Sequence, residues 1–298
     1  MADGINGLTK VCGIFGDPVR HSLSPAMHNA AFAAAGLDYI YVPFQVAGDK
    51  LPDAIKALRA LDLAGVNITI PHKETVLPYL DEISMEAGFI GAVNTVVNRQ
   101  GRLCGENTDG RGFIKALSEQ VGFNPAGKTA LVLGAGGAAR AVAVQLALAG
   151  SAKLLLTNRS RPRAEELARL IAEKTGAAAA VAEWPAQVLP HRDSRMIANA
   201  DLVVQATPVG MYPHTAETVP FPFELLKQDA VVCDLVYNPA RTDFLKKAAH
   251  FGAVTVNGLG MLLYQGALAF ELWTGSPAPV SVMKDALLKA LSPATVNE

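Results

Sequence analysis

The fold of this chain follows from one stretch near its middle, which reads Leu131-Val132-Leu133-Gly134-Ala135-Gly136-Gly137-Ala138-Ala139-Arg140. A strand-like apolar run precedes a glycine-rich turn, and an apolar helix-like run follows it, which is the context of the dinucleotide-binding fingerprint. We expect Gly134 to make the tight turn, Gly136 to let the backbone approach a pyrophosphate, and Ala139 to pack the helix on the strand. The helix N-terminus would supply amide donors to the phosphates. The alternative is a tight turn that only packs a helix on a sheet.

The end of the next expected strand bears on the choice of nucleotide, and it reads Thr157-Asn158-Arg159-Ser160-Arg161-Pro162-Arg163. NAD sites usually place Asp or Glu there to bind the ribose hydroxyls. Arginines without an acid suit a 2′-phosphate instead, because a guanidinium donates paired hydrogen bonds to it. The sequence therefore favours NADP over NAD. A solvated basic turn that opens a helix is the alternative.

Outward from this stretch, short apolar runs alternate with longer helix-like runs, as in βαβ units around a parallel sheet. The first half is expected to hold strands at 11–16, 39–45 and 64–68 and helices at 26–35 and 51–61. Ser24 is expected to cap the first of these helices, with Pro25 at the first helical position. A turn-rich break at 122–127 precedes expected strands at 130–133, 153–157, 202–205 and 231–234.

Length and composition indicate a two-domain globular protein. The chain has 298 residues, which at roughly 150 residues per domain predicts two domains with a cleft between them. Half of the residues are hydrophobic and 18% are charged, as in a compact globule. The formal net charge of -1 provides no attraction for a polyanion, so we expect no nucleic-acid partner.

The chain shows no sign of a membrane or secreted protein. The most apolar stretch, 130–156, is interrupted by glycines, Arg140 and Lys153, so we expect no membrane span. The first ten residues carry Asp3 and no apolar run, which predicts a cytoplasmic protein. The three cysteines lack the spacing of a metal site or a redox pair, so we expect no metal and three buried thiols: Cys12, Cys104 and Cys233.

Short polar residues concentrate in four segments of the first half, 21–25, 67–73, 91–95 and 105–110. Three of the four lie at or just after the ends of expected strands, where open α/β sheets bind their ligands. They offer hydroxyls, an amide, a cation and a carboxylate. That set suits a small polyhydroxylated acid better than an apolar ligand or a metal.

Lys73 and Asp109 are the candidate chemical pair within these segments. Moving a hydride between an alcohol and NADP also moves a proton on the oxygen, and a partly desolvated lysine can exchange that proton near neutral pH. A neighbouring carboxylate would orient the lysine, and the two titrations would be coupled. Taken singly, Lys73 could equally be a surface lysine and Asp109 a helix N-cap. His72 lacks a second ligand at metal spacing, so it is assigned no chemical role.

Beyond the glycine turn the chain carries a series of specific blocks, among them Ser22-Leu23-Ser24-Pro25, Asn67-Ile68-Thr69-Ile70-Pro71-His72-Lys73, Gly91-Ala92-Val93-Asn94-Thr95, Asn107-Thr108-Asp109-Gly110, Asp234-Leu235-Val236-Tyr237-Asn238-Pro239 and Asn257-Gly258-Leu259-Gly260-Met261-Leu262-Leu263-Tyr264-Gln265. In this order the blocks resemble the shikimate dehydrogenase family nearly from end to end. The resemblance implies NADPH-dependent, reversible reduction of 3-dehydroshikimate to shikimate. It also implies an α/β fold in which a Rossmann-type NADP-binding domain, 111–259, is inserted into a substrate domain, 1–110 plus 260–298, with the active site in the cleft between them.

The resemblance also implies roles for single residues. Ser22 and Ser24 would hold the substrate carboxylate, with Tyr237 helping at that end. The ring hydroxyls would be contacted by Thr69, Lys73, Asn94, Asp109 and Gln265, of which Lys73 and Asp109 would be the catalytic pair. The pyrophosphate turn would be Gly134, Ala135, Gly136, Gly137 and Ala138. The adenosine 2′-phosphate would meet Asn158, Arg159, Ser160 and Arg163, and the nicotinamide would meet Leu235, Gly258 and Met261.

Three other functions remain open from the sequence. The nearest is a dehydrogenase for quinate, or for both acids, that uses NAD or NADP. A nucleotide- or metabolite-sensing protein that has lost turnover is disfavoured, because Lys73 and Asp109 are retained. A reductase of the glutamyl-tRNA type would need a nucleophilic cysteine, and none of the cysteines has a supporting motif. The oligomeric state, with a homodimer as one option, also remains open.

Overall fold

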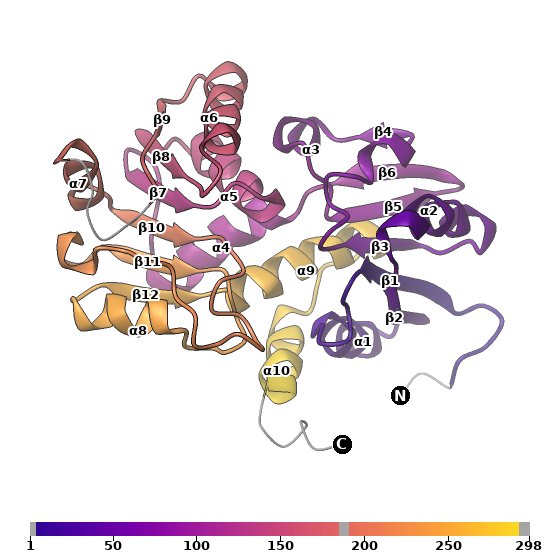
Figure 1. The fold of residues 1–298 in the computed structure, drawn as a ribbon. Helices are drawn as coiled ribbons and strands as arrows, with labels where there is room; N and C mark the ends of the chain where they lie inside the picture. The colour runs from indigo at the N-terminus through magenta and orange to yellow at the C-terminus, as the bar shows by residue number, and fades with distance from the viewer. Residues whose placement is uncertain (1–3, 185–190, 292–298) are drawn as a thin grey trace. The chain divides into compact units, whose positions relative to one another are not determined.

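The computed structural model describes residues 4–184 and 191–291, which form two compact units (Figure 1). The first unit is Met1–Thr108 with Leu263–Glu298, and the second is Asp109–Leu262. Each unit has a six-stranded sheet of its own, and the α/β class is confirmed. The expected domains also include residues 1–3, 185–190 and 292–298, which lie outside the described residues.

The first unit contains a mixed sheet with the strand order β2-β1-β3-β5-β6-β4. Its strands are β1 (Lys10–Gly16), β2 (Tyr39–Gln45), β3 (Gly65–Ile68), β4 (Glu82–Ile83), β5 (Thr95–Arg99) and β6 (Arg102–Glu106). β1 is parallel to β2 and β3, whereas β5 is antiparallel to its neighbours β3 and β6. The amino end of β5 therefore lies at the same edge of the sheet as the carboxyl ends of β1, β3 and β6.

Helices cover this sheet, and they are α1 (Ser24–Ala34), α2 (Leu51–Ala60), α3 (Met85–Ile90), α10 (Val280–Leu291) and the part of α9 (Leu259–Thr274) that begins at Leu263. On α2 the buried residues are Leu51, Ile55 and Leu58, which recur at helical spacing and join the same core cluster as Val66 and Ile68 of β3. α10 packs against α1, and α1 packs against β2. The last helices thus share a core with the first strands.

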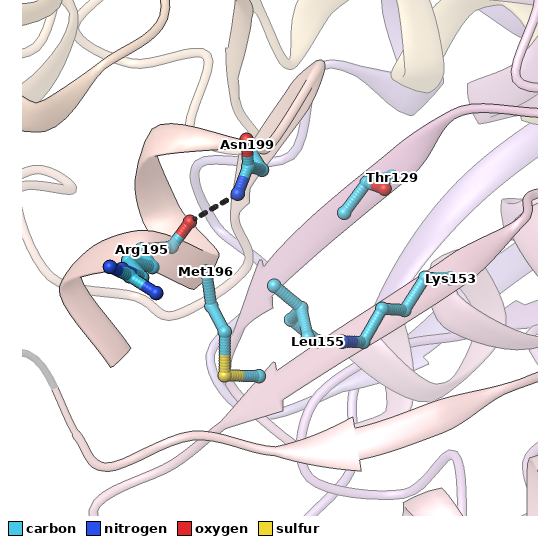
Figure 2. A pocket seen from close by; sticks show the side chains of 6 residues that line it. All are labelled: Thr129, Lys153, Leu155, Arg195, Met196 and Asn199. Atoms are coloured by element: carbon cyan, nitrogen blue, oxygen red, sulfur yellow. Dashed lines mark hydrogen bonds between the residues drawn. The ribbon is translucent and has the colours of Figure 1, made fainter. Parts of the chain in front are cut away.

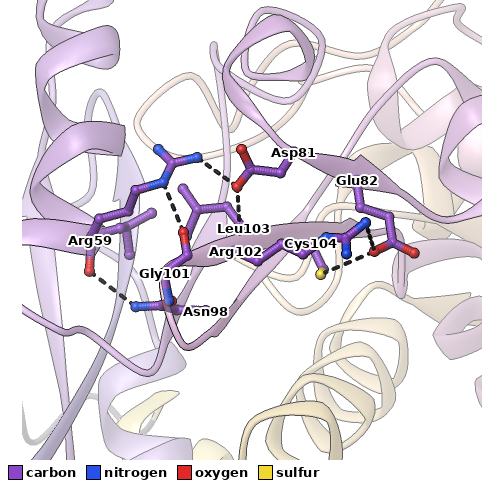
Figure 3. Close-up of polar contacts among 9 residues, drawn as sticks. Arg59, Asp81, Glu82, Asn98, Gly101, Arg102, Leu103 and Cys104 are labelled. Carbon is purple, nitrogen blue, oxygen red and sulfur yellow. Dashed lines mark hydrogen bonds and ion pairs between the residues drawn. The ribbon is translucent and has the colours of Figure 1, made fainter.

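A polar cluster holds the β5–β6 hairpin to its neighbours (Figure 3). Arg59, on α2, donates through Nη2 to Asp81 Oδ2 at 2.7 Å and through Nε to the Gly101 carbonyl at 2.9 Å. Asp81 Oδ2 also accepts from the Leu103 amide at 2.7 Å. These hydrogen bonds, that of Leu103 first, lower the pKa of Asp81. The hairpin is therefore anchored at its turn, while its open end carries two of the polar segments.

The second unit contains a sheet of six parallel strands in the order β12-β11-β10-β7-β8-β9. They are β7 (Thr129–Leu133), β8 (Lys153–Thr157), β9 (Ala179–Val181), β10 (Leu202–Gln205), β11 (Val231–Asp234) and β12 (Val254–Asn257). This is the doubly wound Rossmann order, in which the direction of winding reverses between β7 and β10. Ligands of such sheets bind outside the carboxyl ends of the strands at that reversal.

The helices of the second unit are α4 (Asp109–Val121), α5 (Gly137–Leu148), α6 (Arg161–Thr175), α7 (His191–Ala198) and α8 (Asp243–His250). The β10 and β11 strands are buried along their whole length, as expected for a parallel sheet covered on both faces. On α5 the buried residues are mostly alanine and valine, which lets the helix approach β7 and β8 closely. Ala139 is fully buried, in agreement with the packing role predicted for it.

The strands expected at 39–45, 153–157, 202–205 and 231–234 have the same bounds in the structure. The strands expected at 11–16, 64–68 and 130–133 differ by a single residue at one end. The short strands β4 and β9, the hairpin of β5 and β6, and the last strand, β12, were not expected. The hairpin and β12 lie in or beside segments whose polar and glycine residues resemble loops.

Cys12, Cys104 and Cys233 are free and buried, as predicted. Burial raises the pKa of each thiol above its ordinary value, so the cysteines are unreactive packing residues. Within residues 4–184 and 191–291, no helix has the length and apolar character needed to cross a membrane.

Candidate active site

Three of the four polar segments, 67–73, 91–95 and 105–110, meet at one edge of the first sheet. Asn67, near the end of β3, pairs with Thr95 at the start of β5, and Thr95 pairs with Glu106 at the end of β6. Because β5 is antiparallel, a segment that precedes a strand lies beside segments that follow strands. The structure therefore gathers three of the segments expected to form the substrate site.

Asn94 is the centre of this edge and is only 2% exposed. Its Nδ2 donates to Thr108 Oγ1 at 2.9 Å and to Gln265 Oε1 at 3.3 Å. Its Oδ1 accepts from the Thr108 amide at 2.8 Å and from Thr95 Oγ1 at 3.0 Å. Gln265 lies on α9 and is itself buried. Two residues predicted to contact the substrate, Asn94 and Gln265, are far apart in sequence and are thus directly hydrogen-bonded to each other.

Thr69 and Lys73 follow β3 at the same edge. The Thr69 amide donates to the Phe15 carbonyl of β1 at 2.9 Å, which holds the segment against the first strand. The Lys73 carbonyl accepts from the Val93 amide at 2.8 Å, which places its backbone beside the segment of Asn94. The Lys73 side chain is partly exposed.

Ser22 and Ser24 stand at the start of α1, but the expected cap is wrong. The N-cap position belongs to Leu23, and Ser24 is the first residue of the helix, with Pro25 directly after it. No side chain caps this helix: the Ser24 side chain is hydrogen-bonded to Tyr41, and the Ser24 amide donates to Ser22 Oγ at 3.3 Å. Ser24 is buried and Ser22 is partly exposed.

His72 is a structural residue. It is 1% exposed, and its Nε2 donates to the Val46 carbonyl at 2.7 Å, since a carbonyl oxygen can only accept. Throughout the described ranges, no three His, Cys, Asp or Glu residues are grouped to hold a metal ion. Burial among backbone groups explains the histidine without a ligand.

In the second unit, the glycine turn lies between β7 and α5 at the reversal of the sheet. Gly134 has a φ of +123°, and a Cβ there would be 3.0 Å from the Ala206 carbonyl oxygen, which follows β10. Gly136 has an ordinary φ of −84°, and a Cβ there would meet nothing within 4 Å. Ala135 is buried, whereas Gly137 and Ala138 begin α5 partly exposed. The open space at Gly136, before the N-terminus of α5, fits the close approach of a pyrophosphate.

The arginines after β8 differ in their surroundings. Arg161 begins α6 and pairs with Glu165 at 2.8 Å and with Glu183. Arg159 and Arg163 are exposed. A guanidinium between two carboxylates is not available to a phosphate, so Arg159 suits a 2′-phosphate better than Arg161.

Asn158 and Ser160 shape the turn that carries these arginines. Asn158 Nδ2 donates to the Ser160 carbonyl at 3.0 Å, and Ser160 is the N-cap residue of α6. The backbone amides of the first turn of α6 therefore lie next to the arginines, where they favour an anion.

Leu235, Gly258 and Met261 lie at the carboxyl edge of the second sheet, after β11 and β12. The Gly258 amide donates to the Val236 carbonyl at 3.1 Å, which joins the two loops. Met261 lies on the first turn of α9. The residues expected at the nicotinamide thus follow neighbouring strands.

Asp234 ends β11 beneath these loops and was not singled out from the sequence. Its carboxylate accepts from Thr242 Oγ1 at 2.6 Å, from the Val236 amide at 3.0 Å and from Gln205 Nε2 at 3.2 Å. Burial raises the pKa of Asp234 to about 6, although these hydrogen bonds oppose the shift. Burial also raises the pKa of Tyr237, so both groups are partly desolvated.

Asp109 and Tyr237 belong to the second unit, and the other predicted substrate residues belong to the first. Asp109 is 4% exposed and is the first residue of α4, directly after Thr108, which bonds Asn94.

A separate pocket of about 270 Å³ opens at the opposite edge of the second sheet (Figure 2). It is lined by Thr129 and Lys153, the first residues of β7 and β8, and by Leu155, Arg195, Met196 and Asn199. Because it lies at the amino ends of the strands, it is not the nucleotide edge of a Rossmann sheet.

Comparison with known proteins covers most of the chain. Residues 14–96 match the family described as the shikimate dehydrogenase substrate binding domain, 116–220 match shikimate / quinate 5-dehydrogenase, and 258–288 match the shikimate 5'-dehydrogenase C-terminal domain. The chain is similar to the shikimate dehydrogenase (NADP(+)) of Desulforamulus reducens, with 54% identity over 288 residues that cover 97% of this chain and 98% of the relative.

Two solved structures have the same fold over nearly their whole length. Shikimate 5-dehydrogenase from Thermus thermophilus, in complex with NADP(H) and shikimate, is 41% identical with a TM-score of 0.83, covering 95% of this chain and 100% of that one. Quinate dehydrogenase from Corynebacterium glutamicum, in complex with NAD, is 35% identical with a TM-score of 0.85, covering 94% of this chain and 99% of that one.

Proposed function

Because the chain belongs to the shikimate dehydrogenase family, we propose that it catalyses the NADPH-dependent, reversible reduction of 3-dehydroshikimate to shikimate. The observation that carries the proposal is the buried amide of Asn94, bonded to Thr108 and Gln265 at an edge that also holds Thr69. Such a set of amides and hydroxyls can read the ring hydroxyls of a small acid.

On the substrate side, Ser22 and Ser24 hold the carboxylate at the start of α1, and Tyr237 assists there. Thr69, Asn94 and Gln265 bind the ring hydroxyls. Asn94 and Gln265 are buried and hydrogen-bonded to each other, so their polar atoms keep a fixed arrangement, which supports selective recognition of the ring hydroxyls.

Lys73 and Asp109 move the proton. In the direction of reduction, Lys73 Nζ donates a proton to the substrate oxygen that becomes the hydroxyl, and it takes the proton back in the reverse direction. The Asp109 carboxylate orients the ammonium group. The partial burial of Lys73 and the burial of Asp109 suit this exchange.

NADP(H) supplies the hydride when it is bound. The open space at Gly136 and the N-terminus of α5 receive the pyrophosphate, and Arg159 and Arg163 bind the 2′-phosphate together with Asn158 and Ser160. Leu235, Gly258 and Met261 line the nicotinamide.

We also propose that the substrate domain is 1–110 plus 260–298, that the NADP domain is 111–259, and that the enzyme works in the cytoplasm, which cell fractionation would test. A homodimer is one option for its oligomeric state, and analytical ultracentrifugation would test it.

Initial rates with shikimate and quinate, each with NADP and NAD, test the proposal. We expect the highest kcat/KM for shikimate with NADP. The similarity to a quinate dehydrogenase in complex with NAD makes that activity the second candidate, and a preference for quinate with NAD would establish it instead. Binding of both ligands without turnover would indicate a sensing protein.

A further inference from the structure

Tyr41 is a tyrosine inside the core of the first unit that the proposed reaction does not use. It lies on β2 and is 2% exposed. Its ring stacks on that of His28 with centroids 4.5 Å apart and an angle of 10°, and it lies 6.0 Å from the ring of Trp273. A phenol enclosed in this way cannot change its position easily, and its hydroxyl needs a buried partner.

One partner is Asn67, at the edge where the polar segments meet, and a second side-chain hydrogen bond joins Tyr41 to Ser24. The Tyr41 hydroxyl donates to Asn67 Oδ1 at 2.7 Å. Burial raises the pKa of Tyr41 well above its ordinary value, so the hydroxyl keeps its hydrogen. Asn67 Nδ2 in turn donates to the Asn94 carbonyl at 3.2 Å and to Thr95 Oγ1 at 3.1 Å.

These hydrogen bonds run in one direction. A backbone carbonyl only accepts, and the Asn94 carbonyl, which already accepts from the Ile68 amide at 2.8 Å, can face only the NH₂ side of the Asn67 amide. The Asn67 oxygen therefore faces Tyr41. Thr95 Oγ1 accepts from Asn67 and gives its own hydrogen to Asn94 Oδ1 at 3.0 Å.

The chain of donors ends at the residues proposed to bind substrate. The Thr108 amide also donates to Asn94 Oδ1, so the Asn94 NH₂ group is directed to Gln265 Oε1. The amide groups of Asn94 and Gln265 therefore have defined orientations, and Tyr41 donates to Asn67, the first amide in the series.

We propose that Tyr41 is a positioning residue for the substrate site, which acts through Asn67 and Thr95 to hold the amides of Asn94 and Gln265 in one orientation. This role rests on the proposed function. Without the Tyr41 hydroxyl, Asn67 Oδ1 would be a buried acceptor with a missing donor, and the amide would turn to find water or another partner. That turn withdraws its NH₂ group from Thr95 and Asn94.

Tyr41→Phe removes the hydroxyl and keeps the stacked ring. We expect the KM for shikimate to rise about 3- to 10-fold, the range for one buried hydrogen bond, with little change in the KM for NADP. Tyr39→Phe is the matched control, because Tyr39 lies on the same strand and its hydroxyl donates to the Trp273 carbonyl at 3.5 Å, outside the series. Its KM for shikimate should match that of the unsubstituted enzyme.

A double-mutant cycle with Gln265→Ala distinguishes positioning from general stability. If Tyr41 acts through the series, its effect shrinks once Gln265 is absent, so the two changes are not additive. Thr95→Val, which interrupts the same series at another hydroxyl, should also raise the KM for shikimate and serves as well if Tyr41→Phe does not fold.

Wild-type KM values for shikimate in Tyr41→Phe and Thr95→Val would overturn the positioning role while leaving the proposed function intact. Additive effects with Gln265→Ala would overturn it too. An unsubstituted protein that does not oxidise shikimate would instead overturn the proposed function, and this role with it.

Discussion

Alanine substitutions at Gly134 and Gly136 should separate the structural and the ligand-binding parts of the glycine turn. The two positions are two residues apart, yet they differ in conformation. Gly134 has a φ of +123°, and a Cβ added there would lie 3.0 Å from the Ala206 carbonyl oxygen. Gly136 has a φ of −84°, and a Cβ added there would meet no atom within 4 Å. We therefore expect Gly134→Ala to destabilise the second unit and Gly136→Ala to leave it intact.

The magnitude follows from the backbone conformation. A non-glycine residue in such a disfavoured region costs about 1–3 kcal/mol. For a unit of this size, a loss of about 2 kcal/mol lowers the Tm by roughly 4–8 °C. Gly136→Ala should change the Tm by about 1 °C or less, since the added methyl group meets no protein atom. It should instead weaken NADP binding at least about tenfold, or about 1.4 kcal/mol, because the methyl group fills the space that the pyrophosphate needs.

Scanning calorimetry without ligand and isothermal titration with NADP measure the two effects independently. A Gly134→Ala variant with the Tm of the unsubstituted protein would contradict the backbone role of Gly134. A Gly136→Ala variant that binds NADP with unchanged Kd would contradict the pyrophosphate site at Gly136.

Three further predictions concern single side chains. Lys73→Ala should lower kcat at least about 100-fold, the usual contribution of a general acid or base, while calorimetry still detects shikimate binding; an unchanged kcat would contradict the proton transfer. Arg159→Ala should raise the KM for NADP roughly 10- to 100-fold, as expected for a charged hydrogen bond, and leave the KM for NAD unchanged. The control is Arg161→Ala, because the Arg161 guanidinium already pairs with carboxylates. Equal effects of Arg159→Ala on the KM for NADP and the KM for NAD would contradict the assignment of Arg159 to the 2′-phosphate. Burial raises the pKa of Asp234 from 3.8 to about 6, so between these pH values the folded state binds more protons than the unfolded state. The contribution of Asp234 to the free energy of unfolding therefore falls by up to about 3 kcal/mol as the pH rises from 3.8 to about 6. Urea titrations at several pH values should show this fall relative to Asp234→Asn, and parallel pH profiles of the two proteins would contradict the shifted pKa.

The second unit could be predicted closely because its signals are local. Four of its parallel strands are continuous apolar runs, and the glycine turn marks the start of α5. β12 was missed because two of its residues, Val254 and Thr255, are exposed and resemble a loop.

The site in the first unit was harder to predict from the sequence, because it depends on pairing between strands. Nothing near Asn94 in the sequence indicates that β5 runs antiparallel to β3. This antiparallel pairing is what places the start of β5, next to Asn94, beside Asn67. The cap assigned to Ser24 was wrong for a similar reason, since the Ser24 side chain is hydrogen-bonded to Tyr41, which lies on another element. The sequence did not indicate a functional role for Tyr41, because its hydrogen-bond partner Asn67 is 26 residues away.

The hydrogen bond between Asn94 and Gln265 also determines when the substrate edge can be completed during translation. The two residues are 171 positions apart, so every strand of both sheets is synthesised before Gln265 emerges. The loop that this contact closes is long, but its entropic cost grows only with the logarithm of its length. A nascent chain that stops before α9 therefore has both sheets in its sequence and still lacks the last amide of the Asn94 network. Completion of the substrate edge thus comes near the end of translation, and a chain released earlier has an incomplete set of groups for the ring hydroxyls.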